Sequence, residues 1–412
     1  MNTKIIHKKN YDFSKTKEYF KDVVILPTET VYGIAADIYN INAIQRIYEV
    51  KNRPHDNPLI VHISSLKMLD SLIEGPINIF NSKLIEKYWP GPLTLIFEAK
   101  KTLSHILTNN LSTVAIRMPD CEFTLNVIEH LGHPIVMPSA NLSGRPSTTS
   151  ASHVFDDLNG KVPLIIDGDE CLLGIESTVV NCLSHVPTIL RPGSITYEEI
   201  CNTLQHKVEI CTSLKNKPQQ ILPNISNNHS ITTNESENTE NRLNIEFENK
   251  DSSAYLSPGM KYKHYSPEKP LYLIKQNGNL INEIIISKVK ENKNIIGCIV
   301  NTMNVFTKQT LETFKLIEID DEEYHKKIYN EEIRNNILHE ENMEEIKCNK
   351  SESPVIYVFC YKNDKKLFAE KLFKYLRFYD KMCDCIIAIG TEYTEEGLAV
   401  MDRLEKASTE IF

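Results

Sequence analysis

The sequence predicts an α/β protein with an N-terminal twisted mixed sheet with helices and a smaller C-terminal α/β sheet domain. Three observations lead to this prediction. Short apolar runs alternate with amphipathic stretches over residues 1–210, and a second alternation of this kind begins near residue 268. A long polar segment separates the two regions. The length of 412 residues exceeds that of one ordinary domain.

In the N-terminal region, a series of apolar runs predicts strands. They are VVILPT (23–28), PLIVHIS (58–64), PLTLIFEA (92–99), TVAIRM (113–118), PIVMPSA (134–140), PLIIDG (163–168) and STVVNC (177–182). Between two of them, residues 42–53 place Ile44, Ile47 and Tyr48 on one side of a predicted helix. Many strands with few long helices favour a mixed sheet over a regular alternation of parallel strands and helices.

Residues 214–252 differ in composition from the regions on either side. They are rich in Asn, Ser, Thr and Glu and contain few large apolar side chains. Such a segment buries too little surface to offset its ordering entropy, so we predict that it is disordered. The predicted domains are therefore residues 1–210 and 268–412, joined by a linker at 211–267.

The C-terminal region repeats the alternation of strands and helices on a smaller scale. The runs LYLI (271–274), IIGCIV (295–300), PVIYVF (354–359) and CIIAIG (385–390) predict buried strands. Residues 395–408 place Val400, Leu404 and Ala407 on one face of a predicted helix. Strands that alternate with helices indicate a compact α/β sheet domain.

The overall composition is that of an ordinary globular protein, with 41% hydrophobic residues, 25% charged residues and a formal net charge of −9. A protein that mainly grips the nucleic-acid backbone is more often basic, although a local basic cleft stays possible. The ten cysteines lack the C-x-x-C spacing of zinc sites, which predicts reduced thiols. Neither a secretory signal nor a membrane-spanning apolar stretch is visible, so we expect a cytoplasmic protein without membrane contact.

The common phosphate-binding signatures are absent from the sequence. It contains neither G-x-x-x-x-G-K-[ST] nor G-x-G-x-x-G after a predicted strand. The metalloprotease signature H-E-x-x-H and the hydrolase elbow G-x-S-x-G are absent as well. A nucleotide bound by this protein must therefore be held by side chains.

Polar residues gather where two predicted strands end, which is where α/β sheets bind ligands. PTETVYG (27–33) contributes Thr28, Glu29, Thr30 and Tyr32, and PSANLSG (138–144) contributes Ser139, Asn141, Ser143 and Gly144. Either run has an ordinary interpretation too. The first is compatible with a simple polar loop, and the second can either cap the next helix or bind phosphate oxygens.

Several cations accompany these polar runs. Lys51 and Arg53 stand in what we predict to be a non-helical turn fixed by two prolines, so that both point the same way. They form either a solvated surface pair or part of an anion site. Arg117 lies among apolar neighbours in a predicted strand, either on a solvated face or buried against an anion. Ser177 and Arg191 complete the candidate set.

The order and approximate spacing of PTETVYG, KNRPHDNPLIVH, RMP, PSANLSG, ESTVV and LRPGSI resemble those of the YrdC-type domain. SPGMKYKHYSP (257–267) and EEGLAVMDRLEKAS (395–408) resemble the linker and last helix of its longer, two-domain form. The chain is therefore similar to the two-domain threonylcarbamoyl-AMP synthases, except at residues 214–252. The resemblance implies a nucleotidyltransferase that makes L-threonylcarbamoyl-AMP and pyrophosphate from L-threonine, bicarbonate and ATP, for threonylcarbamoyladenosine modification of tRNA.

The resemblance also implies roles for individual residues, matched motif by motif. The implied L-threonine site consists of Thr30, His62, Arg117, Met137 and Ser177. The implied ATP site consists of Arg53, Asn57, Thr113, Ser139, Ser147 and Arg191, with His264 or Tyr265 of the linker near the nucleotide. The K-x-R and S-x-N motifs, implied to be catalytic, supply Lys51, Arg53, Ser139 and Asn141.

Such a reaction brings together a carboxylate, a carbamate and a triphosphate, which repel one another unless Lys and Arg converge on the cleft. The resemblance further implies Mg²⁺ bound mainly through the ATP phosphates, with no metal ligands assigned on the protein. The linker is expected to close over the cleft as a lid. The implied partners are downstream threonylcarbamoyl transferase proteins, and we expect no stable binding of nucleic acid.

Two other functions compete with this interpretation. The same basic cleft could serve an RNA-binding module, although the acidic total and the lack of aromatic residues among Lys and Arg disfavour it. YrdC-like domains also occur in carbamoyl transferases, but those contain additional zinc-finger or acylphosphatase-like sequence that this chain lacks.

Overall fold

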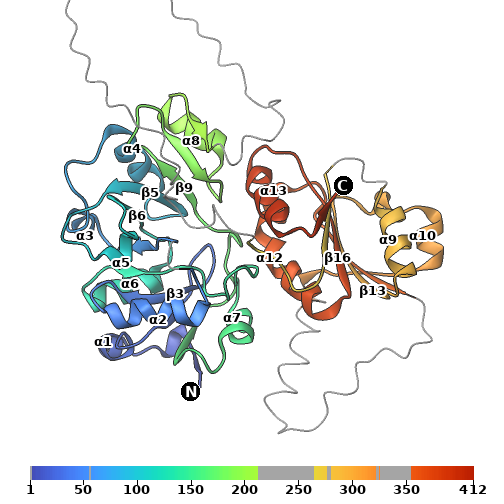
Figure 1. Ribbon diagram of the computed structural model, residues 1–412, viewed down its shortest axis with the longest axis horizontal. Helices are drawn as coiled ribbons and strands as arrows, with labels where there is room; N and C mark the ends of the chain where they lie inside the picture. The colour runs from blue at the N-terminus through green and yellow to red at the C-terminus, as the bar shows by residue number, and fades with distance from the viewer. Residues whose placement is uncertain (1, 55–56, 212–263, 276–279, 322–323, 325–353) are drawn as a thin grey trace, which may run out of the picture.

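The computed structural model describes residues 2–54, 57–211, 264–275, 280–321, 324 and 354–412. It confirms the predicted fold class, with two α/β domains that each contain their own sheet (Figure 1). The segment predicted to be disordered, 214–252, and residues 257–263 of the linker lie outside the described residues. Within these ranges no helix is both long and apolar enough to cross a membrane.

The N-terminal domain is built on an eleven-stranded sheet in the order β1-β8-β2-β3-β7-β4-β6-β5-β9-β10-β11. Its strands are β1 (Lys4–His7), β2 (Val24–Leu26), β3 (Gly33–Asp37), β4 (Ile60–His62), β5 (Leu93–Glu98), β6 (Thr113–Arg117), β7 (Ile135–Val136), β8 (Leu164–Asp167), β9 (Thr178–Asn181), β10 (Thr188–Arg191) and β11 (Glu209–Ile210). The sheet is mixed, as predicted: β4 runs parallel to β6 and antiparallel to β7.

Short helices cover this sheet. They are α1 (Thr16–Tyr19), α2 (Ile41–Lys51), α3 (Leu66–Asp70), α4 (Ile79–Tyr88), α5 (His105–Thr108), α6 (Glu122–Leu131), α7 (Ala151–Leu158) and α8 (Tyr197–Leu204). The predicted helix at 42–53 corresponds to α2, whose buried face includes Ile44, Ile47 and Tyr48. It begins after Asn40, whose side chain accepts a hydrogen bond from the Ala43 amide, as expected of an N-cap.

The C-terminal domain contains a six-stranded parallel sheet in the order β14-β15-β13-β16-β12-β17. Its strands are β12 (Leu271–Ile274), β13 (Ile295–Val300), β14 (Lys315–Glu318), β15 (Val355–Cys360), β16 (Cys385–Ile389) and β17 (Glu410–Ile411). Helices α9 (Leu280–Lys290) and α10 (Lys308–Thr313) lie on the far side of this sheet, whereas α12 (Lys365–Met382) and α13 (Glu396–Ala407) lie between the sheet and the N-terminal domain (Figure 1).

The two domains share an apolar contact. Val31 and Ile175 of the N-terminal domain belong to the same buried cluster as Tyr265, Phe373 and Leu404. Burial of apolar surface across this boundary stabilises the docking of the domains. The second domain is therefore held against the end of the first sheet at which the candidate residues lie.

Candidate functional site

A cavity lies where the N-terminal sheet meets residues 264 and 265. Its lining includes all five residues of the implied threonine site, namely Thr30, His62, Arg117, Met137 and Ser177. From the implied ATP site it includes Arg53, Ser139, Arg191, His264 and Tyr265. The structure thus brings most of the sequence-predicted residues together. It adds Val31, Ile60, Pro138 and Glu176, which we did not predict.

Backbone hydrogen bonds hold the polar runs of the site side by side. The Ala140 amide donates to the Tyr32 carbonyl at 2.8 Å, and the Ile34 amide donates to the Pro138 carbonyl at 2.9 Å. The first bond joins PTETVYG directly to PSANLSG, and the second joins PSANLSG to the next residue of the chain, in β3. Residues that are far apart in the sequence therefore line one wall because their loops pair like short strands.

Arg117, the last residue of β6, is buried against an anion and does not lie on a solvated face. Its Nη2 lies 2.6 Å from Glu29 Oε1, an ionic contact without hydrogen-bond alignment. Its Nη1 donates to Thr30 Oγ1 at 2.9 Å, and its Nε donates to the Gly91 carbonyl at 3.1 Å. The guanidinium is thus fixed in one orientation at the cavity wall.

Arg191, at the end of β10, is fixed in a similar way. Its Nη2 donates to the carbonyl and the hydroxyl of Ser177 at 2.9 and 3.2 Å. Burial lowers the pKa of Arg191. Because the ordinary pKa of an arginine is very high, the side chain stays charged all the same. The Ser177 hydroxyl is also 2.8 Å from Thr94 Oγ1. This part of the wall is therefore positively charged and rigidly bonded.

The prediction that Lys51 lies in a non-helical turn is wrong. Lys51 is the last residue of α2, and Asn52 turns the chain with a left-handed φ of 50°. The Lys51 side chain is 1% exposed, and its Nζ donates to the carbonyls of Ser139 and, at 2.7 Å, Asn141. Burial, followed by the charge of Arg53, holds the pKa of Lys51 well below its ordinary value. Lys51 therefore supports the Ser139 loop from behind and does not line the cavity.

Arg53 is buried as well, so the solvated-pair alternative is excluded for both cations. Its Nη2 donates to the Pro58 carbonyl at 3.0 Å, and its Nε donates to the Asn57 carbonyl at 3.4 Å. Asn57 therefore braces Arg53 through its backbone. Of the K-x-R pair, only Arg53 lines the cavity.

Three other predicted residues lie away from the lining. Asn141 is fully buried, and its Nδ2 donates to the carbonyls of Leu142 and Arg145. Ser147 donates its hydroxyl to Glu176 Oε1 at 2.5 Å, one layer behind the wall. Thr113 is at the opposite end of β6 from Arg117, about 13 Å away at the usual strand rise. The role assigned to each of these residues stays a prediction.

His62 and His264 are neutral at the cavity. Burial, followed by the charge of Arg117, lowers the pKa of His62 to about 3. Burial also lowers the pKa of His264 to about 3. His62 Nδ1 is 3.2 Å from the Ile60 carbonyl, which can only accept, so this nitrogen carries the proton. His62 Nε2 is then a hydrogen-bond acceptor, suited to an ammonium or hydroxyl group.

The carboxylates of the site already have cationic partners. Glu29 contacts Arg117, and Glu176 accepts hydrogen bonds from Arg403 of α13. Across the described ranges, no cluster of three or more His, Cys, Asp or Glu side chains is arranged to hold a metal ion. Every cysteine in those ranges carries a free thiol.

The burial of Lys51 predicts a loss of stability on substitution. Lys51→Met removes the donor from two carbonyls in a buried loop, so the free energy of unfolding should fall by about 2 kcal/mol or more. The matched control is Lys101→Met, because Lys101 is exposed. Chemical denaturation of both variants measures the difference. Equal midpoints for the two variants would contradict the assigned role.

The two neutral histidines predict a loss of stability in acid. Their pKa values are near 6.5 in the unfolded chain and about 3 in the folded protein, so the unfolded state binds more protons between these values. Stability is therefore fully present above pH 6.5 and decreases as pH falls towards 3. From pH 6.5 to 5 the two histidines together should cost about 3 kcal/mol.

Urea denaturation at a series of pH values measures this dependence. His62→Gln should remove about half of the combined contribution of His62 and His264, while the buried His153, whose pKa burial also lowers, contributes equally in both proteins. His185→Gln, at an exposed position, is the matched control. A His62→Gln profile identical in shape to the wild type would show that His62 is not held neutral.

Two families of known proteins match this chain. Residues 21–193 match the family described as Telomere recombination, and residues 195–409 match the family described as Threonylcarbamoyl-AMP synthase, C-terminal domain. The threonylcarbamoyl-AMP synthase of Pyrococcus abyssi is 34% identical, over 94% of this chain and 90% of its own length. That of Schizosaccharomyces pombe is 32% identical, over 94% of this chain and 85% of its own.

A solved structure matches across both domains. The crystal structure of Pyrococcus abyssi Sua5 complexed with L-threonine superposes with a TM-score of 0.71 at 30% identity. The match covers 100% of this chain and 98% of that chain. Together with the two family matches, this likeness extends over both sheets and over the residues that line the cavity. The chain belongs to the threonylcarbamoyl-AMP synthase family, in its two-domain form.

Proposed function

We propose that the chain makes L-threonylcarbamoyl-AMP and pyrophosphate from L-threonine, bicarbonate and ATP. One observation carries the proposal: Arg53, Arg117 and Arg191 converge on a single cavity together with a neutral histidine and serine hydroxyls. L-Threonine, bicarbonate and ATP each carry a negatively charged group. Positive charge in the cavity is needed to offset the repulsion between these groups when they bind together. The names of the relatives, and the L-threonine bound to the Pyrococcus abyssi protein, support the choice of substrate.

In the proposed reaction the threonine amine combines with bicarbonate to give a carbamate and water. A carbamate oxygen then attacks the α-phosphorus of ATP, and pyrophosphate leaves. Arg117 and Thr30 would hold the threonine carboxylate, and His62 Nε2 would accept a hydrogen bond from its amine or hydroxyl. Arg53, Arg191 and the Ser139 hydroxyl would hold the nucleotide. Catalysis would consist mainly of positioning and charge stabilisation.

The described side chains offer no carboxylate set for a metal, since Glu29 and Glu176 are paired with arginines. Mg²⁺ would therefore enter with ATP, held by phosphate and water oxygens, and would offset the phosphate charge. The adenylate is proposed to pass to downstream threonylcarbamoyl transferase proteins for tRNA modification. His264 and Tyr265, above the cavity, would limit its hydrolysis by excluding water.

The test is an assay of pyrophosphate release with L-threonine, bicarbonate, Mg²⁺ and ATP, and mass spectrometry of the fresh adenylate. Release should require both L-threonine and bicarbonate, and labelled bicarbonate should appear in the adenylate. L-Valine, which has the shape of threonine without the hydroxyl, is the matched control substrate. Pyrophosphate release that is independent of threonine would contradict the proposal.

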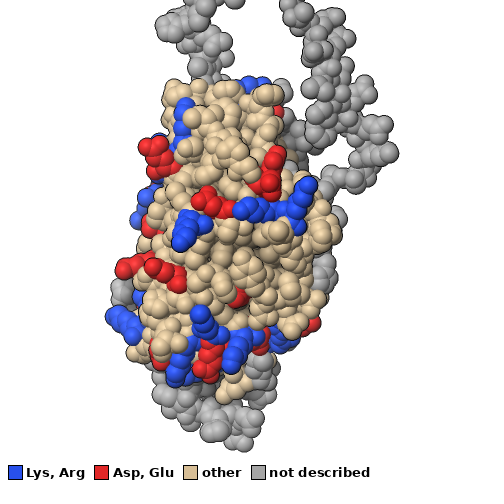
Figure 2. All heavy atoms as spheres, turned by 90° about the vertical axis from the view of Figure 1, so that its left-hand side faces the viewer, with Lys and Arg blue, Asp and Glu red and all other residues tan. Residues whose placement is uncertain are grey.

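The one face of the N-terminal domain seen in Figure 2 gives the RNA-binding alternative no particular support. On the face of the N-terminal domain seen in Figure 2, Lys and Arg lie among Asp and Glu and form no continuous basic band. A titration with tRNA over a series of salt concentrations separates the two functions, because binding through phosphates weakens steeply with salt.

A further inference from the structure

A buried arginine of the second domain contacts residues that line the cavity. Arg403 of α13 is completely buried, although it is among the bulkiest side chains of the protein. Its Nε and Nη2 donate to Glu176 Oε2 at 3.3 and 3.1 Å, and its Nη1 donates to the Pro192 carbonyl. Its guanidinium carbon also lies 5.5 Å from the centre of the Tyr265 ring. One side chain of the second domain therefore contacts three segments around the cavity.

Glu176 transmits this contact to the N-terminal domain. Glu176 lines the cavity, and Ser177 follows it directly in the chain. Its Oε1 accepts a hydrogen bond from the Ser147 hydroxyl at 2.5 Å. Burial opposes ionisation of Glu176, but the charges of Arg403 and then Arg191 hold its pKa below its ordinary value. A carboxylate thus stays ionised in the wall of an anion site, and the second domain supplies its main counter-charge.

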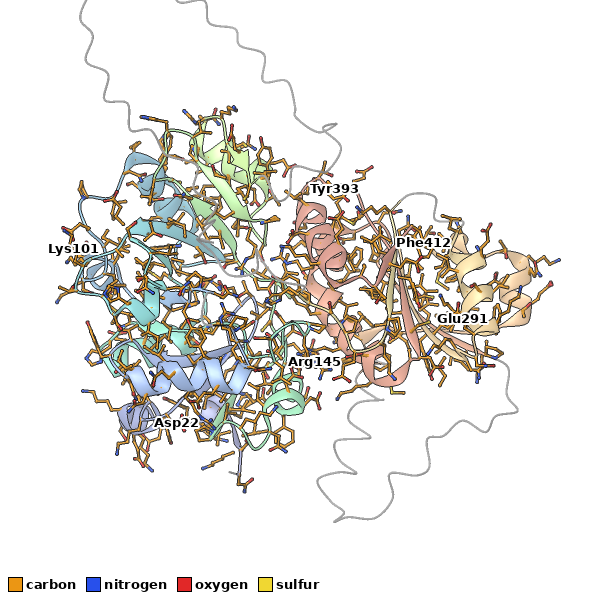
Figure 3. All side chains as sticks on the ribbon, in the orientation of Figure 1. Asp22, Lys101, Arg145, Glu291, Tyr393 and Phe412 are labelled. Carbon is orange, nitrogen blue, oxygen red and sulfur yellow. The ribbon has the colours of Figure 1, made fainter. Side chains whose placement is uncertain are left out.

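A second arginine of the same domain holds the loop that carries Ser147. Arg377 of α12 donates to the carbonyls of Pro146 and Ser147 and forms a two-pronged pair with Asp157 at 2.8 and 3.1 Å. Asp157 in turn accepts the Leu142 amide at 3.1 Å. Arg145, at the boundary between the domains in Figure 3, adds an ion pair to Asp380 of α12. The loop from residue 142 to 147 is therefore fixed from the second domain.

We propose that the C-terminal domain positions the nucleotide site, with Arg403 as a positioning residue that acts through Glu176. Without Arg403, the Glu176 charge would repel the phosphates and compete for Arg191. With Arg403 in place, Glu176 instead orients the Ser147 hydroxyl, and Arg191 stays directed at Ser177 and the cavity. This inference rests on the function proposed above and extends it to the role of the second domain.

The proposed pairing of Arg403 with Glu176 predicts how substitutions of these two residues change the affinities for ATP and L-threonine. Arg403→Met should lower the affinity for ATP at least tenfold. It should change the affinity for L-threonine by less than threefold, because the contacts that hold Arg117 and Thr30 do not involve Arg403. Arg403→Met combined with Glu176→Gln should recover most of the ATP affinity, since the uncompensated carboxylate is gone. Arg403→Lys, which keeps the charge, should stay within a few-fold of the wild type.

The matched control is Lys374→Met. Lys374 of α12 is another buried cation between the domains, paired with Glu170 at 2.9 Å, and it does not line the cavity. Its loss should loosen docking and lower the melting temperature while leaving both affinities within twofold. A purely structural role for Arg403 would make Arg403→Met resemble Lys374→Met.

Calorimetric titration of each full-length variant with ATP and Mg²⁺, and separately with L-threonine, measures the pattern. Equal ATP affinities in Arg403→Met and the wild type would overturn the inference alone. A double variant no better than Arg403→Met would also overturn it. If Arg403→Met does not fold, Arg403→Lys and the double variant provide the comparison. Wild-type protein that binds neither ligand would overturn the proposed function, and this inference with it.

Discussion

A chain that ends at Cys211 should lose at least about 100-fold in the rate of threonylcarbamoyl-AMP formation, although it keeps the K-x-R and S-x-N motifs. This fragment lacks His264 and Tyr265, so water enters the cavity, weakens each charge contact and hydrolyses the adenylate. It also leaves Glu176 and Asp157 without Arg403 and Arg377. The assay is pyrophosphate release together with direct detection of the adenylate.

The matched control is an internal deletion of residues 218–248, which removes none of the residues that the structure describes. This deletion should leave the rate within a few-fold of the wild type, because the composition of residues 214–252 predicts a flexible tether. The closure free energy of such a tether changes by only about 0.6 kcal/mol per doubling of its length. Full activity of the fragment ending at Cys211 would show that the second domain has another task.

Arg117→Ala should lower the affinity for L-threonine by a factor of about 30 to 5,000, which corresponds to about 2–5 kcal/mol. The reason is that the carboxylate of the bound threonine would lose its charged partner in a buried site. ATP should be weakened far less. The same substitution leaves Glu29, 7% exposed, without its counter-charge, so the free energy of unfolding should also fall by about 3–5 kcal/mol. Calorimetric titration with each ligand, and chemical denaturation, measure the two effects separately.

A double variant distinguishes binding from folding. Arg117→Met with Glu29→Gln removes both charges, so most of the stability should return while threonine binding stays weak. If threonine affinity returned together with stability, Arg117 would act only through its contact with Glu29. Equal weakening of ATP and threonine by Arg117→Ala would also contradict the assignment to the threonine site.

Local patterns were enough to predict most of the fold. The β4 and β6 runs are continuous and apolar, and they form adjacent strands of the sheet. Strand β3, GIAAD, was missed because its small side chains carry little strand preference. It forms because its backbone pairs with β2 and β7, which local propensity does not reveal. The edge strands β1 and β14 are short and have polar residues at both ends, so their sequences give little local signal for a strand. They too were missed.

The sequence predicted most of the residues that line the cavity, but it predicted fewer of the contacts that these residues make. Pro54 and Pro58 suggested a turn around Lys51, but the helix continues to Lys51 and Asn52 provides the turn. A signal for Arg403 was present: it is three residues after Val400 and four before Ala407, on the apolar face of α13, where an arginine needs a buried partner. That its partner is Glu176 depends on how the domains dock, which no local pattern encodes.

The pairing of Arg403 with Glu176 has a consequence for the folding pathway. The two residues are 227 positions apart in the chain, and Arg377 contacts the Pro146 carbonyl across 231 positions. Contacts of such high sequence separation form slowly, because loop-closure entropy is lost before they contribute stability. On refolding from denaturant, each sheet should therefore form before the cavity is complete. Catalytic activity should then return more slowly than the circular dichroism signal of the helices and strands.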